Sequence, residues 1–74
     1  MAIGERIHFF RNLRGMTQKF LGTSVGFSES QADVRIAQYE TGKRNPKEVY
    51  LNALADTLGV APEALNVPDI DTYI

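Results

Sequence analysis

Length, composition and charge exclude several classes of protein before any motif is considered. The chain has 74 residues, of which 43% are hydrophobic and 23% charged, and it has no cysteine. It therefore fits one small globular domain without disulfides or thiolate metal sites. No apolar run approaches the roughly 20 residues of a membrane-spanning helix, and no signal-peptide pattern opens the chain, so we expect a cytoplasmic protein.

The charge is unevenly distributed along the chain. The formal net charge is −1, yet residues 1–47 hold all eight basic and four acidic residues, whereas residues 48–74 hold five acidic residues and no basic one. Phosphate binding depends on the charge near the contact. The basic part is therefore compatible with a nucleic-acid partner.

A first helix is expected over residues 3–14, with Gly15 ending it. Apolar residues at helical spacing form its expected buried stripe: Ile3, Ile7, Phe10 and Leu13. His8 is the only histidine, and a single imidazole without cysteine makes a poor metal site. We therefore expect no metal and no other cofactor.

A second helix is expected to begin after Thr17, a favourable N-cap residue. Gln18 then lies in the first turn, where backbone N–H groups favour an anion. Gly22 falls inside this helix. A glycine there costs about 1 kcal/mol relative to alanine, so we expect close packing against the next helix to be the reason for it.

A third helix is expected over residues 31–41. The sequence Ser30-Gln31-Ala32-Asp33 matches a capping box, in which the serine caps the helix and the carboxylate reaches back. Gly42 can end the helix in a left-handed conformation. Its expected buried stripe is Ala32, Ile36 and Tyr39.

The opposite side of this third helix carries Val34, Arg35, Gln38 and Thr41, with Asp33 at its leading edge. Arginine and glutamine suit bidentate hydrogen bonds to guanine and adenine in the major groove of DNA. Every amphipathic helix has a polar side, so a solvated surface is the alternative interpretation of this helix taken alone.

A fourth helix is expected to start with Asn45 as cap and Pro46 at the first helical position, and Gly59 can close it. Its expected buried stripe is Leu51, Leu54, Ala55 and Leu58, and residues 61–65 are expected to form a short fifth helix. The fold class is therefore all-α, a compact bundle of five helices, with a domain at residues 1–67 and a C-terminal tail at residues 68–74.

Four segments in this order resemble the Cro and phage-repressor type of helix-turn-helix domain, the XRE family: Met16-Thr17-Gln18, Leu21-Gly22, residues 36–46 (IAQYETGKRNP) and residues 54–60 (LADTLGV). The resemblance covers roughly residues 3–67. It implies a lambda-repressor-like fold whose third helix enters the major groove of double-stranded DNA, a role in transcription regulation, and a homodimer on DNA. The turn at residues 25–30 is about four residues longer than the family pattern.

Residue chemistry and the resemblance together assign the candidate sites. The candidates for contact with bases are Gln38, Arg35, Val34 and Asp33, the last of which could serve only the helix cap. The candidates for contact with phosphates are Thr17, Gln18, Thr41, Lys43 and Arg44. The resemblance also pairs Arg11 with Glu40 across the first and third helices as an architectural ion pair.

A second function, from another class, is a protein-interaction or antitoxin-like module whose acidic C-terminal half meets a basic partner. The five acidic residues after residue 47 motivate it. Catalysis is not expected, because the sequence shows no Ser-His-Asp set, no paired glutamates and no glycine-rich phosphate loop.

Overall fold

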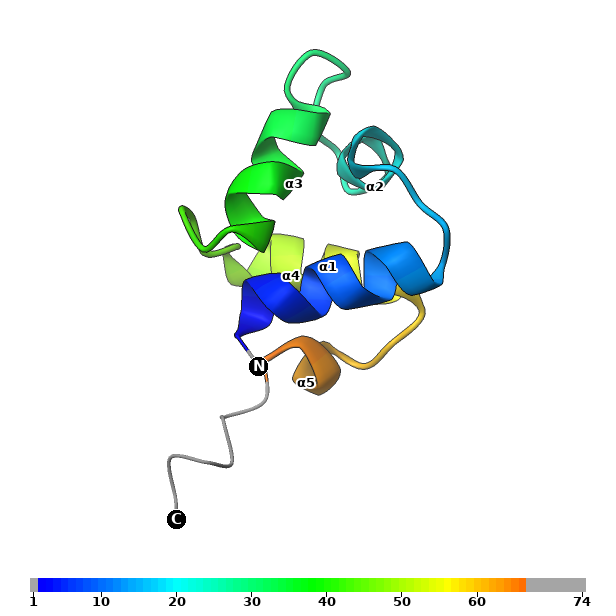
Figure 1. Ribbon diagram of the computed structural model, residues 1–74, viewed down its shortest axis with the longest axis vertical. Coiled ribbons are helices and arrows are strands. Elements are labelled where there is room, and N and C mark those ends of the chain that lie inside the picture. The colour runs from blue at the N-terminus through cyan, green and yellow to red at the C-terminus, as the bar shows by residue number, and fades with distance from the viewer. Residues whose placement is uncertain (1, 67–74) are drawn as a thin grey trace.

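Five helices account for most of residues 2–66, the part of the chain that the computed structural model describes (Figure 1). They are α1 (Ile3–Leu13), α2 (Gln18–Ser24), α3 (Ala32–Glu40), α4 (Glu48–Leu58) and α5 (Pro62–Leu65), and no strand occurs in this range. The all-α, five-helix prediction is confirmed. The predicted tail at residues 68–74 lies outside the described residues. None of the described helices is long and apolar enough to cross a membrane.

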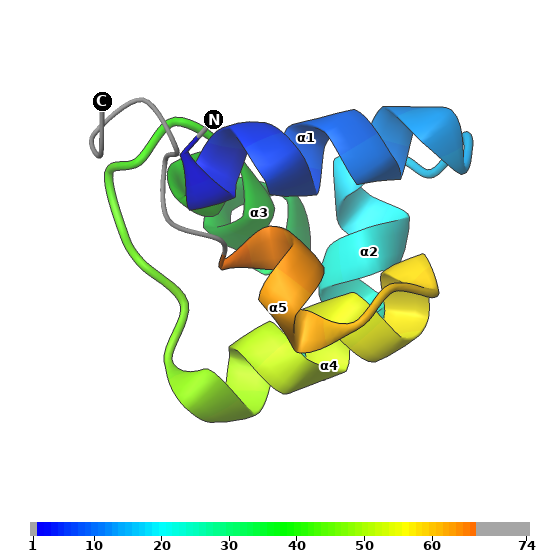
Figure 2. The ribbon, with the colours of Figure 1, turned by 90° about the horizontal axis from the view of Figure 1, so that it is seen from below.

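The helices enclose one small core. Figure 2 shows α1 and α4 on opposite sides with α5 between them and α3 behind, and α2 packs mainly against α3. Every helix contributes at least one side chain that is almost completely removed from water, which is the main favourable contribution to folding. The largest of these side chains are Ile7, Leu21, Ile36, Leu54, Leu58 and Leu65.

Two glycines let α3 approach its neighbours closely. A Cβ atom on Gly22 would lie 2.5 Å from the carbonyl oxygen of Ala32, and one on Gly4 would lie 2.3 Å from that of Tyr39. Backbone atoms thus occupy the space that a side chain would need. The two ends of α3 are therefore held against α2 and α1 at distances that only glycine allows.

The buried face of α1 differs from the predicted stripe at one position. Ile7 is fully buried and Ile3 and Phe10 pack against the core, but Leu13 is 61% exposed. The buried face is centred on Gly4, Ile7 and Arg11. Because each helical residue turns by about 100°, Leu13 then points away from the core.

The predicted capping box of α3 is absent. The N–H groups of Gln31 and Ala32 both donate to the carbonyl of Ser28, at 3.0 and 2.9 Å, so a tight turn leads directly into the helix. Gln31 takes the N-cap position without a side-chain cap, and Asp33 accepts from the N–H of Val34. The prediction that Ser30 caps α3 is wrong, because this turn supplies the local hydrogen bonds instead.

The start of α4 also lies later than predicted. Lys47 is the N-cap, in an extended conformation, and the helix begins at Glu48. Pro46 therefore precedes the cap, and Asn45 does not cap the helix. The ends that depend on glycine are as predicted: Gly59 follows α4 in the left-handed conformation with φ at 73°.

We expect Gly22→Ala to lower the free energy of unfolding by about 1–3 kcal/mol, the usual effect of overpacking. In an open helix the same change would stabilise by about 1 kcal/mol, so the sign of the effect tests the contact with Ala32. Urea denaturation measures it, with Ser24→Ala at an exposed position of α2 as the control. Stabilisation by Gly22→Ala would contradict the close approach of α2 and α3.

Candidate nucleic-acid interface

The outer surface of α3 presents a mixed row of side chains to solvent. Val34 is 47% exposed, and Asp33 and Thr41 are also exposed. Gln38 and Arg35 are half-buried. The stripe predicted for the opposite side is buried as expected, with Ala32 and Ile36 fully buried and Tyr39 at 6% exposure.

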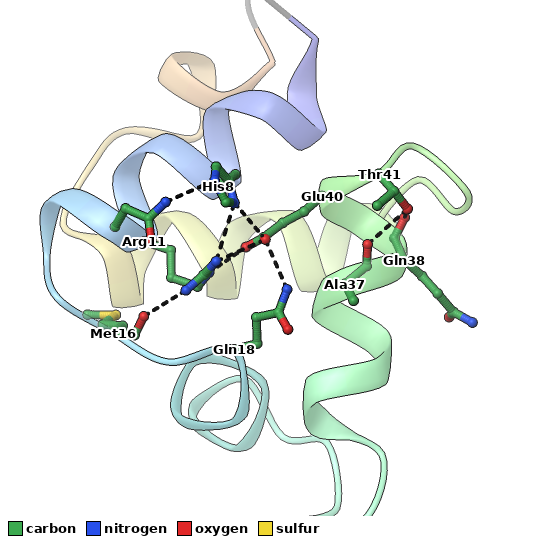
Figure 3. Close-up of polar contacts among 9 residues, drawn as sticks. His8, Arg11, Met16, Gln18, Ala37, Gln38, Glu40 and Thr41 are labelled. Carbon is green, nitrogen blue, oxygen red and sulfur yellow. Dashed lines mark hydrogen bonds and ion pairs between the residues drawn. The ribbon is translucent and has the colours of Figure 1, made fainter.

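Gln38 and Thr41 lie at the C-terminal end of this surface (Figure 3). The Thr41 hydroxyl donates to the carbonyl of Ala37 at 3.0 Å, which fixes its side chain against the last turn. The Oε1 atom of Gln38 is covered and has no hydrogen-bond partner among the described residues. An unpaired buried acceptor is unfavourable. A hydrogen bond from a donor to this oxygen would therefore lower the free energy.

Arg35 lies at the edge of the outer surface of α3, on the side that faces Phe27, rather than in the middle of that surface. Its guanidinium group lies 5.9 Å from the ring centroid of Phe27, a distance within the range of cation–π contacts. Phe27 belongs to the long turn between α2 and α3. The turn therefore directs Arg35 toward α4.

Glu40 forms a hydrogen-bonded network with residues of α1 and α2 (Figure 3). Its carboxylate accepts from Arg11 Nε at 2.5 Å and Nη2 at 3.1 Å, and from Gln18 Nε2 at 3.1 Å. Arg11 also donates to the carbonyl of Met16 at 2.9 Å. The ion pair expected between Arg11 and Glu40 is thus present, and it joins α1, the start of α2 and the end of α3.

His8 completes this network, which sequence reasoning did not foresee. Its Nδ1 lies 2.9 Å from Glu40 Oε1, and its Nε2 lies 2.9 Å from Asn12 Nδ2. In the contact with Glu40 the Nδ1 atom can donate, and in the contact with Asn12 the Nε2 atom can accept. The spacing of His8, Arg11 and Asn12 at i, i+3 and i+4 places them on one side of α1 and was the available signal.

The network changes the pKa of Glu40. Burial by itself would raise this pKa, but the hydrogen bonds from Arg11, His8 and Gln18 and the charge of Arg11 outweigh it, so the pKa is lowered from its ordinary value of 4.5. Glu40 is therefore a carboxylate at neutral pH, with a side chain only 6% exposed. Its charge is neutralised inside the protein.

The start of α2 lies beside this network. Thr17 is the N-cap, as predicted, and its hydroxyl accepts from the N–H of Phe20 at 3.0 Å. Gln18, in the first turn, is half-buried and is held by Glu40. A cavity of about 610 Å³ next to this network is lined in part by Gln18, Glu40 and Thr41. The structure thus brings candidate phosphate contacts of α2 and α3 to one side of the molecule.

Lys43 and Arg44 lie in the loop after α3, and both are exposed. The N–H of Arg44 donates to the carbonyl of Gln38 at 3.1 Å, which holds the loop against the end of the helix. Neither side chain forms an ion pair with another residue in the range 2–66. Two cations thus flank the outer surface of α3 at its C-terminal end.

Comparisons with known proteins agree with this architecture. A family model described as a helix-turn-helix domain matches residues 2–66. The chain is 32% identical over 66 residues to the uncharacterized HTH-type transcriptional regulator YazB of Bacillus subtilis (strain 168), covering 89% of this chain and 90% of that protein. The structure of the present chain is similar to the crystal structure of the P22 c2 repressor protein in complex with synthetic operator 9T in the presence of Tl+. The TM-score is 0.81 and the sequence identity is 33%, and the match covers 93% of this chain and 98% of the repressor chain.

We expect the stability of the fold to depend on Glu40 at acidic pH. Because its pKa is lowered in the folded state, its contribution is complete above the ordinary value of 4.5 and is lost as the pH falls through the lowered folded pKa. Glu40→Gln should therefore be less stable than the parent at neutral pH, and its stability should fall less on acidification.

Urea denaturation at a series of pH values below neutral measures this difference. Glu63→Gln, at an exposed position of α5, is the matched control and should retain the parental pH dependence. The same slope of stability against pH in Glu40→Gln and in the parent would refute the assignment.

Proposed function

The chain belongs to the helix-turn-helix domain family, and we propose that it is a transcriptional regulator that binds specific sequences of double-stranded DNA. One observation carries the proposal. The outer surface of α3 is open to solvent, the start of α2 is fixed beside it through Glu40, and Lys43 and Arg44 follow it directly. This arrangement suits a helix that enters the major groove while its surroundings hold phosphates.

Base recognition would fall mainly to Gln38 and Val34. A glutamine amide can pair with the N6 and N7 atoms of adenine, and an apolar side chain can contact a thymine methyl group. Gln38 must rotate to expose Oε1 for such a pair, because that atom is covered in the free protein. Asp33 and Arg35 have a smaller part in this proposal, since each already has an intramolecular partner.

Phosphate contacts would come from both sides of α3. Thr17 and Gln18 would supply them from the start of α2, together with the N–H groups of its first turn. Thr41, Lys43 and Arg44 would supply them from the end of α3 and its loop. Such contacts fix the position of the protein on the duplex without reading its sequence.

We also propose that two copies bind together. The described chain supplies one candidate recognition helix, α3, and dimeric members of this class place two such helices in successive major grooves about 34 Å apart. The similar P22 c2 repressor was solved with an operator, which supports a related geometry for this chain.

Gln38→Ala and Lys43→Ala should weaken DNA binding in different ways. Loss of a base contact should reduce discrimination between sites by about 1–3 kcal/mol, whereas loss of a phosphate contact should weaken all sites alike. Lys43→Ala should also lower the slope of log K against log salt concentration by about 0.9. Fluorescence anisotropy measures both effects, with a site selected from a random DNA pool and with mutated versions of that site.

Glu63→Gln, at an exposed position of α5 outside the proposed interface, is the control for a change of surface charge. An equal loss at all sites from Gln38→Ala would reject the assignment of Gln38 to base recognition.

Cooperative binding tests the dimer. On a duplex with two half-sites about 34 Å apart, we expect a complex of two chains that binds more tightly than one chain on a half-site. Insertion of half a helical turn between the half-sites should remove this gain. Analytical ultracentrifugation of the complexes gives the stoichiometry, and two independent binding events with any spacing would contradict the dimer.

A further inference from the structure

The cavity of about 610 Å³ beside the Glu40 network has one wall that the proposed interface does not use. That wall belongs to α1, and its four side chains are spaced at i, i+3, i+4 and i+7, which places them on one face of the helix. They are Glu5, His8, Phe9 and Asn12. The remaining walls come from the end of α3 and the first turn of α2. Three helices therefore border a space within the size range of small-ligand sites.

The charge of this cavity favours a cation. Two of its lining side chains are carboxylates, Glu5 and Glu40, and no lysine or arginine of the described residues lines it. Arg11 balances the charge of Glu40. Two carboxylates and one guanidinium group thus leave one negative charge in excess. A cleft that carries charge of one sign raises the local concentration of ligands of the opposite sign.

Phe9 adds an aromatic ring that the core leaves half open. The residue is 49% exposed. Its ring meets that of Phe10 edge to face, with centroids 5.3 Å apart and ring planes at 78°. Phe10 packs against the core, so this contact holds the Phe9 ring in place. An aromatic ring attracts an ammonium group placed over its face and offers apolar surface to the rest of a ligand.

His8 and Asn12 complete the wall from α1. The two ring nitrogens of His8 contact Glu40 Oε1 and Asn12 Nδ2, each at 2.9 Å, so the ring is held from both sides (Figure 3). Asn12 uses its amide nitrogen in this contact. Its carbonyl oxygen can therefore accept a hydrogen bond from an ammonium group.

We propose that this cavity binds a small organic cation, in which a primary ammonium group is carried on an apolar or aromatic body. The carboxylate of Glu5 attracts the ammonium group, and the body covers the ring of Phe9. Gln18 and Thr41, both candidates for phosphate contact, line the same cavity. The bound cation therefore covers them and competes with DNA. Binding of the cation is independent of the proposed function, whereas the competition rests on it.

The first arm of the test uses protein without DNA. Phenethylammonium chloride is titrated into ¹⁵N-labelled protein at constant ionic strength, with potassium chloride as the balancing salt. Phenethyl alcohol and phenylacetate have a similar body without the positive charge. Saturable amide shifts around Glu5, Phe9 and Thr41 are expected from the ammonium compound. The alcohol should bind more weakly, and phenylacetate should give no saturable shift.

Two variants separate the contributions of charge and ring. Glu5→Gln retains an acceptor for the N–H of Ala2, which Glu5 now binds at 3.1 Å, and should weaken phenethylammonium binding by about threefold, the scale of a surface ion pair. Phe9→Leu should weaken it by about threefold through loss of the cation–π contact. The matched controls, Glu63→Gln and Phe20→Leu, change exposed residues that do not line the cavity. Both controls should bind like the parent, and thermal unfolding checks that each variant is folded.

The second arm measures DNA binding in the presence of the cation. Phenethylammonium chloride should weaken binding to a site selected from a random DNA pool more than potassium chloride at equal ionic strength does. Glu5→Gln should need about three times as much of the ammonium compound for the same loss. Fluorescence anisotropy measures both effects.

The outcomes separate the cation site from the proposed function. If phenethylammonium gives no saturable shifts, or if the alcohol binds as tightly, the cavity is no cation site. Saturable shifts with unchanged DNA affinity support the site and reject the competition. If the protein binds no DNA at all, the proposed function fails and the first arm alone decides the cavity.

Discussion

The ion pair between Arg11 and Glu40 is the contact on which the rest of the structure depends. Both side chains are almost covered, with exposures of 11% and 6%. A buried charge is unfavourable unless it is paired and hydrogen-bonded, and here both groups meet that condition. Removal of one partner from such a pair typically costs about 3–5 kcal/mol, a large share of the stability of a small domain.

This pair has a geometric consequence because Glu40 is the last residue of α3. Its carboxylate accepts from α1 through Arg11 and from the first turn of α2 through Gln18. Gly4 and Gly22 allow the backbones to come close enough for these bonds. The relative position of α2 and α3 is thus fixed by polar groups at one end of α3 and by a glycine contact at the other. A rigid pair of helices is what a groove-reading surface requires.

The sequence predicts a helix well where its end is set by a glycine or its buried face by the spacing of apolar residues. It predicts a helix poorly where the position of the first residue depends on the path of the preceding loop. Gly15, Gly42 and Gly59 all take positive φ beyond the helices they follow, as a residue-level argument can foresee. The starts of α3 and α4 could not be foreseen. The capping preferences of Ser30 and Asn45 are weak compared with the turn closed on Ser28 and with the extended approach to Lys47.

The candidate site shows the same limit. Helical spacing placed Arg35 on the outer surface of α3. In the structure, its contact with the ring of Phe27 holds it at the edge of that surface. No local pattern predicts that contact, because it depends on how a long turn folds back toward α4. His8 was set aside as a metal ligand for a sound reason, but its role in the Glu40 network depends on a residue 32 positions away.

The two sides of α3, one facing α1 and α2 and the other facing α4, therefore differ in charge. This difference orients the proposed complex. On the side of α1 and α2, the carboxylate of Glu40 is neutralised by Arg11, and the exposed carboxylate of Glu5 lines the cavity beside it. On the side of α4, Arg35, Arg44 and Lys47 form no ion pair with a carboxylate of the described residues. A duplex is negative along both strands. It should consequently be held on the first side mainly by hydrogen bonds from the start of α2, and on the second mainly by charge, so salt should weaken the second set of contacts more than the first.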